Sequence, residues 1–207
     1  MCIRDRYAVE YSEKLISNGD TDDAIDVLEN TLSYNRDNSM VYMSLSIAYN
    51  ENADFEEAIE ILEELFKLDK NNFRVALLIS INSIEIDDFE SAYEWGQKSM
   101  KISRNNAESL AHMGNLYYKS MQTCRGDNLS RSDKIVESLS HEYFVKAENK
   151  GNSKYFKQKK WLEENEVLFS YADWFMTDKD IQASGKVFPS GKCYDWVSES
   201  LAKQSDW

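Results

Sequence analysis

Three sets of residues recur every 34 positions, and this period limits the fold more than any other feature of the sequence. The sets are Ala24, Ala58 and Ala92; Asn38, Asn72 and Asn106; and Ser12, Ser46, Ser80 and Gly114. Between them, apolar residues follow one another at the spacing of a single helix face, as at Ala58, Ile61, Leu62 and Leu65. Each period therefore predicts two helices joined by a short turn.

Small side chains give a physical reason for the recurrence. Two antiparallel helices pack closely only where the residues at their crossing are small, so Ser46 and Ala58 are expected to face each other. Larger residues such as Tyr42, Leu45 and Leu62 fill the space toward the next pair. A single pair cannot bury this apolar stripe, whereas stacked neighbours can. The pattern predicts an all-α solenoid of antiparallel helix pairs.

The amino-acid composition agrees with a helical chain and limits the classes of partner that it can bind. The sequence has one proline, Pro189, and seven glycines in 207 residues, so long helices meet few breakers. Its formal net charge is −13, and residues 1–100 carry 22 acidic and 8 basic side chains. Phosphate backbones attract basic clusters, so no nucleic-acid partner is expected. No stretch approaches the roughly 20 apolar residues of a membrane span, and the chain is expected to be soluble.

The repeating unit resembles the tetratricopeptide repeat. Residues 39–72 match the pattern of that family with Tyr42, Leu45, Ser46, Tyr49, Phe55, Ala58 and Leu62. Weaker matches cover residues 5–38, 73–106 and 107–152, and the proline usual near the end of each unit is absent. The resemblance implies a right-handed superhelical solenoid over residues 7–152.

The fourth unit, residues 107–152, departs from the pattern. Gly114 stands at the expected place in its first helix. The period puts the small residue of the second helix at position 126, but Ser140 takes that place instead. The intervening sequence "QTCRGDNLSRSD" is polar. It predicts an inserted loop at about residues 122–133.

The beginning of the chain carries an unusual string. The letters "MCIRDR" resemble a translated sequencing-adapter scar, so residues 1–6 are expected to be a non-native prefix. We then expect an N-terminally truncated bacterial fragment that was preceded by further repeats. Any targeting segment would lie upstream, so cytoplasmic and periplasmic locations both stay open.

The residues after the repeats differ in composition. Residues 150–207 are rich in aromatic side chains and contain four of the five tryptophans, Trp161, Trp174, Trp196 and Trp207, which is unlike a disordered segment. Residues 153–168 are expected to form a helix that caps the end of the array. Residues 169–207 are expected to pack back on the array as an irregular aromatic segment, with a hairpin at Pro189–Gly191 and then a short helix.

The resemblance also implies a function and a site. In tetratricopeptide arrays the first helix of each pair lines a concave face that holds a peptide or partner protein. The corresponding residues here are Met40, Met43, Ile47, Asn50, Arg74, Leu77, Ile81, Ile84, Ala111, Asn115 and Tyr118. Flexible methionines on an apolar surface suit a partner recognised by shape and burial. We therefore expect a scaffold for protein–protein interaction.

Three other interpretations stay open at this point. The C-terminal segment of the chain itself covers the concave face. Alternatively, that aromatic segment is the recognition element of an assembly or regulatory module. In the third, the chain is an accessory domain of a larger enzyme or secretion complex.

The sequence lacks recognisable catalytic chemistry. The stretch "GKVFPSGKC" superficially resembles a phosphate-binding loop, but five residues instead of four separate Gly185 from Gly191, and Cys193 replaces the hydroxyl residue that holds magnesium. Only two histidines are present, and the common catalytic motifs are missing. We expect no enzyme activity, cofactor or metal site. Cys124 and Cys193 pair only in an oxidising compartment, and the sequence favours reduced thiols.

Overall fold

The computed structural model describes residues 3–205, which form an all-α chain with one pair of very short strands. The chain divides into two compact units, one ending at Asp88 and the other beginning at Phe89. Within the described residues the helices follow the repeat period, so the prediction of stacked helix pairs is confirmed.

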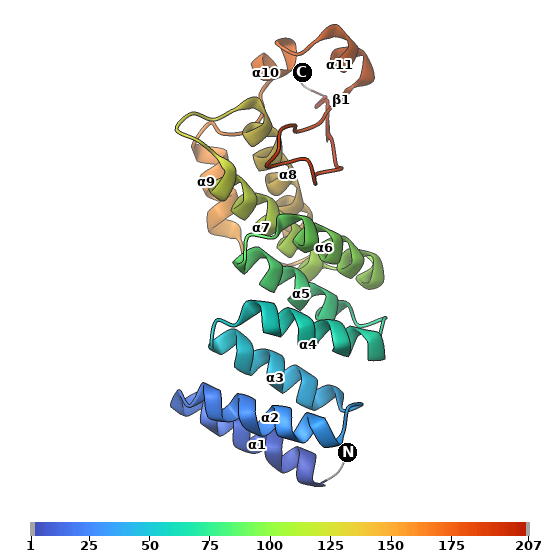
Figure 1. Ribbon diagram of the computed structural model, residues 1–207. Helices are drawn as coiled ribbons and strands as arrows, with labels where there is room; N and C mark the ends of the chain where they lie inside the picture. Colours follow the sequence, from blue (N-terminus) through green and yellow to red (C-terminus); the bar gives the residue numbers. More distant parts are fainter. Residues whose placement is uncertain (1–2, 206–207) are drawn as a thin grey trace. The chain divides into compact units, whose positions relative to one another are not determined.

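The first unit consists of five helices that pack side by side in chain order (Figure 1). They are α1 (Ile3–Asn18), α2 (Thr21–Tyr34), α3 (Ser39–Glu51), α4 (Phe55–Leu68) and α5 (Phe73–Glu85). Each helix contacts the next, and α1 also contacts α3. The helices therefore bury one another's apolar faces, as in an array of repeats.

The recurring small residues lie in the core, as predicted. Ala24 and Ala58 are both 0% exposed, and Ser12 and Ser46 are 0% and 1% exposed. Leu28, Leu45 and other apolar side chains surround them in one buried cluster. The period of the repeat therefore reflects close approach between neighbouring helices.

The recurring asparagines cap the helices that begin each repeat. The Asn38 side chain accepts hydrogen bonds from the amides of Met40 and Val41, and the Asn72 side chain accepts one from Val75. An amide side chain at this position pairs with N–H groups that the first helical turn leaves free. The asparagine thus marks the start of a repeat where the family proline is missing.

A second feature with the same period ends the first helix of each pair. Gly19, Ala53 and Asp87 stand at the same place in successive repeats, and all have a positive φ, of 87°, 63° and 58°. The amide after each of them donates to a carbonyl in the last turn of the preceding helix, at 2.9 Å in all three cases: Asp20 to Leu15, Asp54 to Tyr49 and Asp88 to Ser83. This pattern is a common helix C-terminal motif that closes with a left-handed residue.

The predicted prefix takes part in the first helix. Residues 3–6 form the start of α1, whereas residues 1 and 2 lie outside the described residues. Asp5 is buried, and its carboxylate accepts hydrogen bonds from the side-chain amides of Asn35 at 2.8 Å and Asn38 at 2.9 Å. The described part of the prefix is therefore integrated with the first unit.

The second unit contains six helices and two strands among its described residues. They are α6 (Phe89–Ser103), α7 (Ala107–Cys124), α8 (Arg131–Glu148), α9 (Phe156–Glu164), α10 (Tyr171–Phe175), α11 (Lys179–Ser184), β1 (Lys186–Val187) and β2 (Leu201–Ala202). Helix α7 packs against α6 and α8, and α8 packs against α9. The strands are antiparallel, with Lys186 opposite Ala202 and Val187 opposite Leu201.

The loop predicted at residues 122–133 is wrong in extent. The connection spans only residues 125–130, and α7 and α8 each have 18 residues, compared with 13 to 15 in α3 to α6. Met121 and Ile135 are buried where the extra turns meet, so they extend the apolar contact between the helices. Ser130 and Asp133 form a capping box that starts α8. The polar composition of the inserted sequence made these helical turns look like a loop.

The hairpin and short helix predicted near Pro189 are also wrong. The strands β1 and β2 do pair, but residues 188–200 separate them, and the turn at Pro189–Gly191 lies inside this long loop. No helix follows it in the described residues. The loop is held by contacts with α6, α7 and α8, which are described below, and not by helical or strand hydrogen bonds of its own.

Candidate functional site

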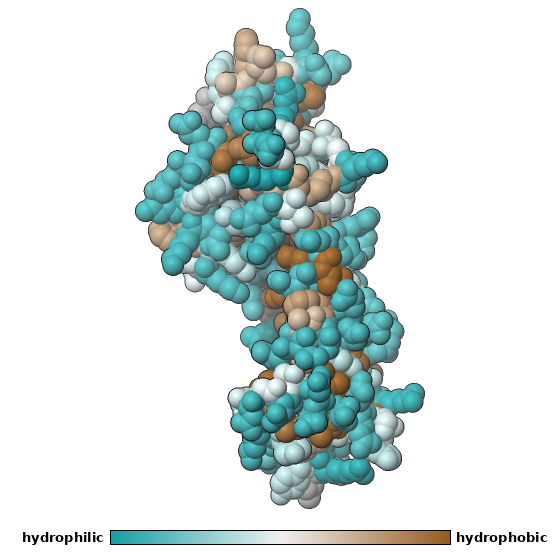
Figure 2. Space-filling model, turned by 60° about the vertical axis from the view of Figure 1, so that its left-hand side comes forward, coloured by the Kyte–Doolittle hydropathy of each residue, from teal (hydrophilic) through white to brown (hydrophobic). Residues whose placement is uncertain are grey.

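The predicted concave face has its most accessible apolar residues on α3. Met40 is 48% exposed and Ile47 is 47% exposed, whereas Met43 and Asn50 are half-buried. Positions separated by two helical turns lie on the same side of a helix, so Met40 and Ile47 face the same direction. Figure 2 shows a mainly hydrophilic surface on which apolar side chains gather in a few patches.

The residues of the face on α5 are less accessible. Arg74 is exposed and Ile81 is half-buried, but Leu77 and Ile84 are buried, at 5% and 6% exposure. The Arg74 guanidinium lies 5.8 Å from the centre of the Phe73 ring. On α3, the Asn50 amide donates to the carbonyl of Ser46 at 2.7 Å. Arg74 and the half-buried Ile81 are therefore the accessible members of the predicted face on α5.

The residues of the face on α7 contact the chain itself. Ala111 is 1% exposed and lines a small pocket together with Phe156 and Lys159 of α9. Tyr118 meets Trp161 of α9 edge to face, with 6.1 Å between the ring centres. Asn115 is half-buried. Helix α9 therefore covers Ala111 and Tyr118, and a partner has little access to this part of the predicted face.

The C-terminal loop occupies a different surface, formed by α6, α7 and α8. Trp196 lies against three rings, with centre-to-centre distances of 6.3 Å to Phe89, 5.5 Å to Tyr93 and 5.8 Å to Tyr117. Sequence reasoning missed this cluster, because its members come from separate segments of the chain. Its only sequence signal was the high aromatic content of the C-terminal region.

Glu199 completes this contact with its carboxylate. It accepts hydrogen bonds from the Tyr143 hydroxyl at 2.8 Å and from the Gln97 side-chain amide at 2.6 Å. Burial raises the pKa of Tyr143 above its ordinary value, and the nearby negative charge of Glu199 raises it further. The tyrosine hydroxyl thus stays protonated and remains a hydrogen-bond donor at neutral pH.

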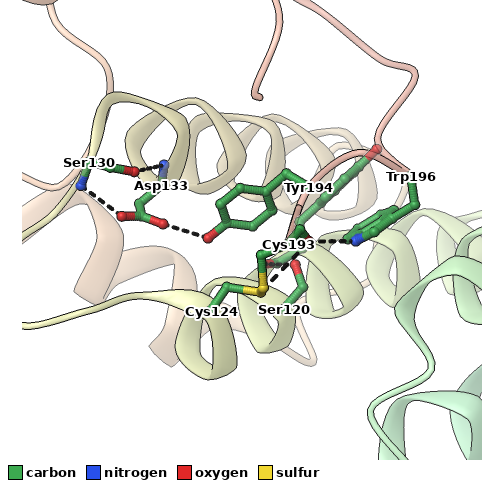
Figure 3. The surroundings of a disulfide bond; sticks show 8 residues. Ser120, Cys124, Ser130, Asp133, Cys193, Tyr194 and Trp196 are labelled. Carbon is green, nitrogen blue, oxygen red and sulfur yellow. Dashed lines mark hydrogen bonds between the residues drawn. A yellow bond between two sulfur atoms is a disulfide. The ribbon is translucent and has the colours of Figure 1, made fainter. Parts of the chain in front are cut away.

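A disulfide between Cys124 and Cys193 joins the loop to the end of α7, with a Cα–Cα distance of 6.0 Å (Figure 3). Beside it, the Tyr194 hydroxyl donates to Asp133 at 2.6 Å, and the Trp196 indole donates to the Cys193 carbonyl at 2.8 Å. The prediction of reduced thiols is therefore wrong. The cysteines lie 69 residues apart in sequence, so only the docking of the loop brings them together.

Glu137 and His112 are buried titratable groups of the second unit. Glu137 is 0% exposed, and neither carboxylate oxygen has a hydrogen-bond partner among the described residues. Burial raises its pKa to about 8, against the opposing effect of the nearby Arg125 charge. His112 is also buried, and burial lowers its pKa to about 4, with a smaller contribution from Lys154. Both groups are therefore held in their neutral forms near neutral pH.

Other kinds of site have no candidate in the described part of the chain. Residues 3–205 contain no group of three or more histidine, cysteine, aspartate or glutamate side chains placed to hold a metal ion. No helix in that range has the length and apolar character needed to cross a membrane. The surfaces of α3 and α5 and of α6, α7 and α8 remain the candidates for function.

Comparison with solved structures identifies similar folds. A MamA double mutant, "MamA RS-1 ArsTM", is 14% identical over 81% of this chain and 88% of its own, with a TM-score of 0.62. A crystal structure of MamA protein is 19% identical over 81% of this chain and 96% of its own, with a TM-score of 0.53. MamA from residue 41 to its end, from Desulfovibrio magneticus RS-1, is 14% identical over 80% and 98%, also with a TM-score of 0.53. At these identities the likeness concerns the fold.

Comparison of sequences identifies the family. No curated protein matches the sequence significantly. Residues 15–80 match the sequence model of the family described as "Tetratricopeptide repeat", and that segment contains the buried Ala24 and Ala58 and the capping Asn38 and Asn72. Repeats of this kind are scaffolds for protein–protein interaction, so the chain has the architecture of such a scaffold. From this match and the helix pairs of the structure we conclude that residues 15–80 consist of tetratricopeptide repeats.

Proposed function

We propose that the first unit binds an extended peptide or a helix of a partner protein along α3 and α5. The observation that supports this most is the exposure of Met40 and Ile47, at 48% and 47%, on one side of α3. Burial of these apolar side chains by a partner is favourable, because it removes their surface from water. Methionine adapts its shape to the partner because its side chain is unbranched and flexible.

The net charge of the first unit indicates which charged residues flank the apolar anchor of the partner. Residues 1–88 carry 20 acidic and 7 basic side chains, so a partner with basic residues around its anchor associates faster than an acidic one. Arg74 on α5 is a local exception. We therefore propose a partner segment with two apolar anchors about two helical turns apart, flanked by lysine or arginine.

Selection of binding peptides tests this proposal. Peptides selected from a random display library against the purified full chain are measured by fluorescence anisotropy against three proteins: the unchanged chain, Ile47→Glu and Leu68→Glu. Leu68 is a matched control because it is exposed to a similar degree, 45%, but lies at the end of α4. We expect Ile47→Glu to weaken binding at least tenfold, and Leu68→Glu to leave it unchanged. Equal binding by all three proteins would contradict the proposed site.

A second candidate rests on the exposed aromatic residues of α10. Tyr171, Phe175 and Met176 are 55%, 67% and 72% exposed, and the rings of Tyr171 and Phe175 lie 6.3 Å apart. Such a patch supports the alternative in which the C-terminal segment is a recognition element. The same selection distinguishes the two: binding that is lost in Phe175→Ser but kept in Ile47→Glu would place the partner on α10.

A further inference from the structure

The loop between β1 and β2 lies on the surface of α6, α7 and α8 as a bound peptide lies on a receptor. Its Trp196 covers the rings of Tyr93 and Tyr117, and its Glu199 accepts hydrogen bonds from Tyr143. The backbone between these two residues is irregular. Beside the hydrogen bond of Tyr194 to Asp133, the contact therefore includes two side-chain anchors, an aromatic ring and a carboxylate three positions later.

The site for the carboxylate consists of neutral donors. Besides Tyr143 at 2.8 Å, the Gln97 amide donates to Glu199 at 2.6 Å, and the Tyr93 hydroxyl lies 3.5 Å away. Hydrogen bonds between neutral donors and an ionised acceptor are stronger than those between neutral groups. Such a set of donors selects a carboxylate over a neutral side chain, so the surface recognises an acidic residue.

One position of this surface differs from its counterpart in the first unit. Glu29 and Tyr49 stand two repeat periods before Gln97 and Tyr117, at the same places in their repeats. There, the Tyr49 hydroxyl donates to Glu29, so α2 supplies its own acidic acceptor. In the second unit glutamine takes the place of Glu29, and its side-chain amide donates to Glu199 of the loop.

In the first unit, helices of the repeat keep their packing beside an open cleft. A cleft of about 400 Å³ lies over α2, α3 and α4. It is lined by Glu29, Leu32, Ser33, Arg36, Tyr42, Leu45, Ile61 and Glu64. Its helices follow the repeat although the cleft is open. The helices α6, α7 and α8 are therefore expected to keep their packing when the loop is displaced.

We propose that the surface of α6, α7 and α8 under this loop is a second binding site, for an extended segment of a partner protein that carries an aromatic residue followed three positions later by a carboxylate. The chain's own Trp196 and Glu199 occupy this site and block it. The disulfide between Cys124 and Cys193 holds the loop in place, because it fixes the residue just before Tyr194 to the end of α7.

Reduction of the disulfide frees the site. Cys193 is exposed, so a dithiol has access to it. In the exchange, one thiolate of the dithiol attacks a cysteine sulfur and the second thiolate resolves the mixed disulfide. Two electrons pass to the Cys124–Cys193 pair, both cysteines take up protons, and the dithiol becomes a cyclic disulfide. Only its own contacts and its covalent tether to β1 and β2 then hold the loop on this surface, and a partner segment competes with it there.

A labelled peptide with the sequence of residues 192–202, with serine in place of Cys193, tests the site by fluorescence anisotropy. The receptor is the full chain with Trp196→Ala and Glu199→Ala, treated with dithiothreitol, so that its own loop no longer competes. We expect this receptor to bind the peptide at least tenfold more tightly than the oxidised unchanged chain does. A peptide without the tryptophan is expected not to bind. Absence of binding to a receptor with full helical circular dichroism would overturn the proposal.

Two tyrosine variants of that receptor locate the contact. Tyr143→Phe removes the hydroxyl that donates to the carboxylate and is expected to weaken peptide binding at least fivefold. Tyr118→Phe is the matched control, because Tyr118 lies on α7 but its ring meets Trp161 of α9. Equal weakening by both substitutions would show that the peptide binds elsewhere.

Hydrogen exchange of the unchanged chain covers the case in which the double substitution impairs folding. After reduction, we expect the amides of residues 193–201 to exchange at least tenfold faster while those of α6, α7 and α8 keep their protection. If the three helices lose protection together with the loop, the loop is part of the core, and the proposed site does not exist.

Discussion

The Ser140 hydroxyl donates a hydrogen bond of 2.7 Å to the carbonyl of Gly114, where α8 crosses α7. Both residues are buried, and they occupy the two small-residue places of the fourth repeat. The contact shows that this repeat keeps the crossing of the earlier ones, although its helices are longer. The helices approach closely because the side chains at these two positions are small.

Substitution of Gly114 by alanine tests that approach. An added Cβ would lie 2.5 Å from one carbon of the Phe144 ring, which is itself buried and stacked on Tyr155. Alanine favours a helix over glycine by about 1 kcal/mol, but the overlap forces Phe144 to move, at a cost of about 1–3 kcal/mol or more. We expect a net loss of stability in urea unfolding. Phe144→Leu in the same chain should recover part of it, whereas a stable Gly114→Ala variant would refute the close contact.

At Ala53 the reverse substitution, of alanine by glycine, is expected to stabilise the protein. Its φ of 63° is unfavourable for alanine, and Gly19 occupies the equivalent place one repeat earlier. A left-handed backbone costs an L-residue about 1–2 kcal/mol, of which the greater freedom of unfolded glycine offsets about half. We expect Ala53→Gly to raise the free energy of unfolding by roughly 0.5–1 kcal/mol. The control Ala48→Gly, in the buried interior of α3, should lower it. A loss of stability in Ala53→Gly would show that the turn does not strain this residue.

The cap at Asn106 gives a third prediction. Its side-chain oxygen accepts a hydrogen bond of 2.8 Å from the amide of Ser109, at the start of α7. Removal of this acceptor in Asn106→Ala is expected to cost about 1 kcal/mol of stability in chemical unfolding. Asn106→Asp keeps an acceptor at the same place and should remain close to the unchanged protein. If the two variants lose the same stability, capping is not the role of this residue.

The buried Glu137 predicts a dependence of stability on pH. Below pH 4.5 its carboxyl is protonated in both the folded and the unfolded chain, so it carries no penalty. As the pH rises, the unfolded chain ionises first, and the free energy of unfolding falls until the pH passes the folded pKa of about 8. Glu137→Gln removes this effect. We expect the variant to gain on the order of 1–3 kcal/mol at pH 8 and little at pH 4.5.

Unfolding in urea at pH 4.5, 6 and 8 measures this difference. Glu164→Gln serves as the control, because the Glu164 side chain is exposed and lies on α9. Its stability should follow that of the unchanged protein at all three values. A constant difference between Glu137→Gln and the unchanged protein would mean that Glu137 is already ionised in the folded chain.

The sequence by itself determined the repeat. Ala24, Ala58 and Ala92 return with the period, and all are 0% exposed in the structure. Such positions are visible in a sequence because a helix crossing, a cap or a helix end involves residues close to one another within one repeat. The same period also held signals that were readable but missed, such as the left-handed turns at Gly19 and Ala53.

Only the tertiary structure decided what covers each surface. Cys124 and Cys193 are paired across 69 positions, and the Tyr93 hydroxyl lies 2.7 Å from that of Ser198, 105 positions away. No periodicity links such residues, because their approach depends on the path of an irregular loop over three helices. For the same reason, the sequence placed Ala111 on an open face that α9 covers in the folded chain. Local patterns fix the helices, whereas contacts between distant segments determine which of their faces a partner can reach.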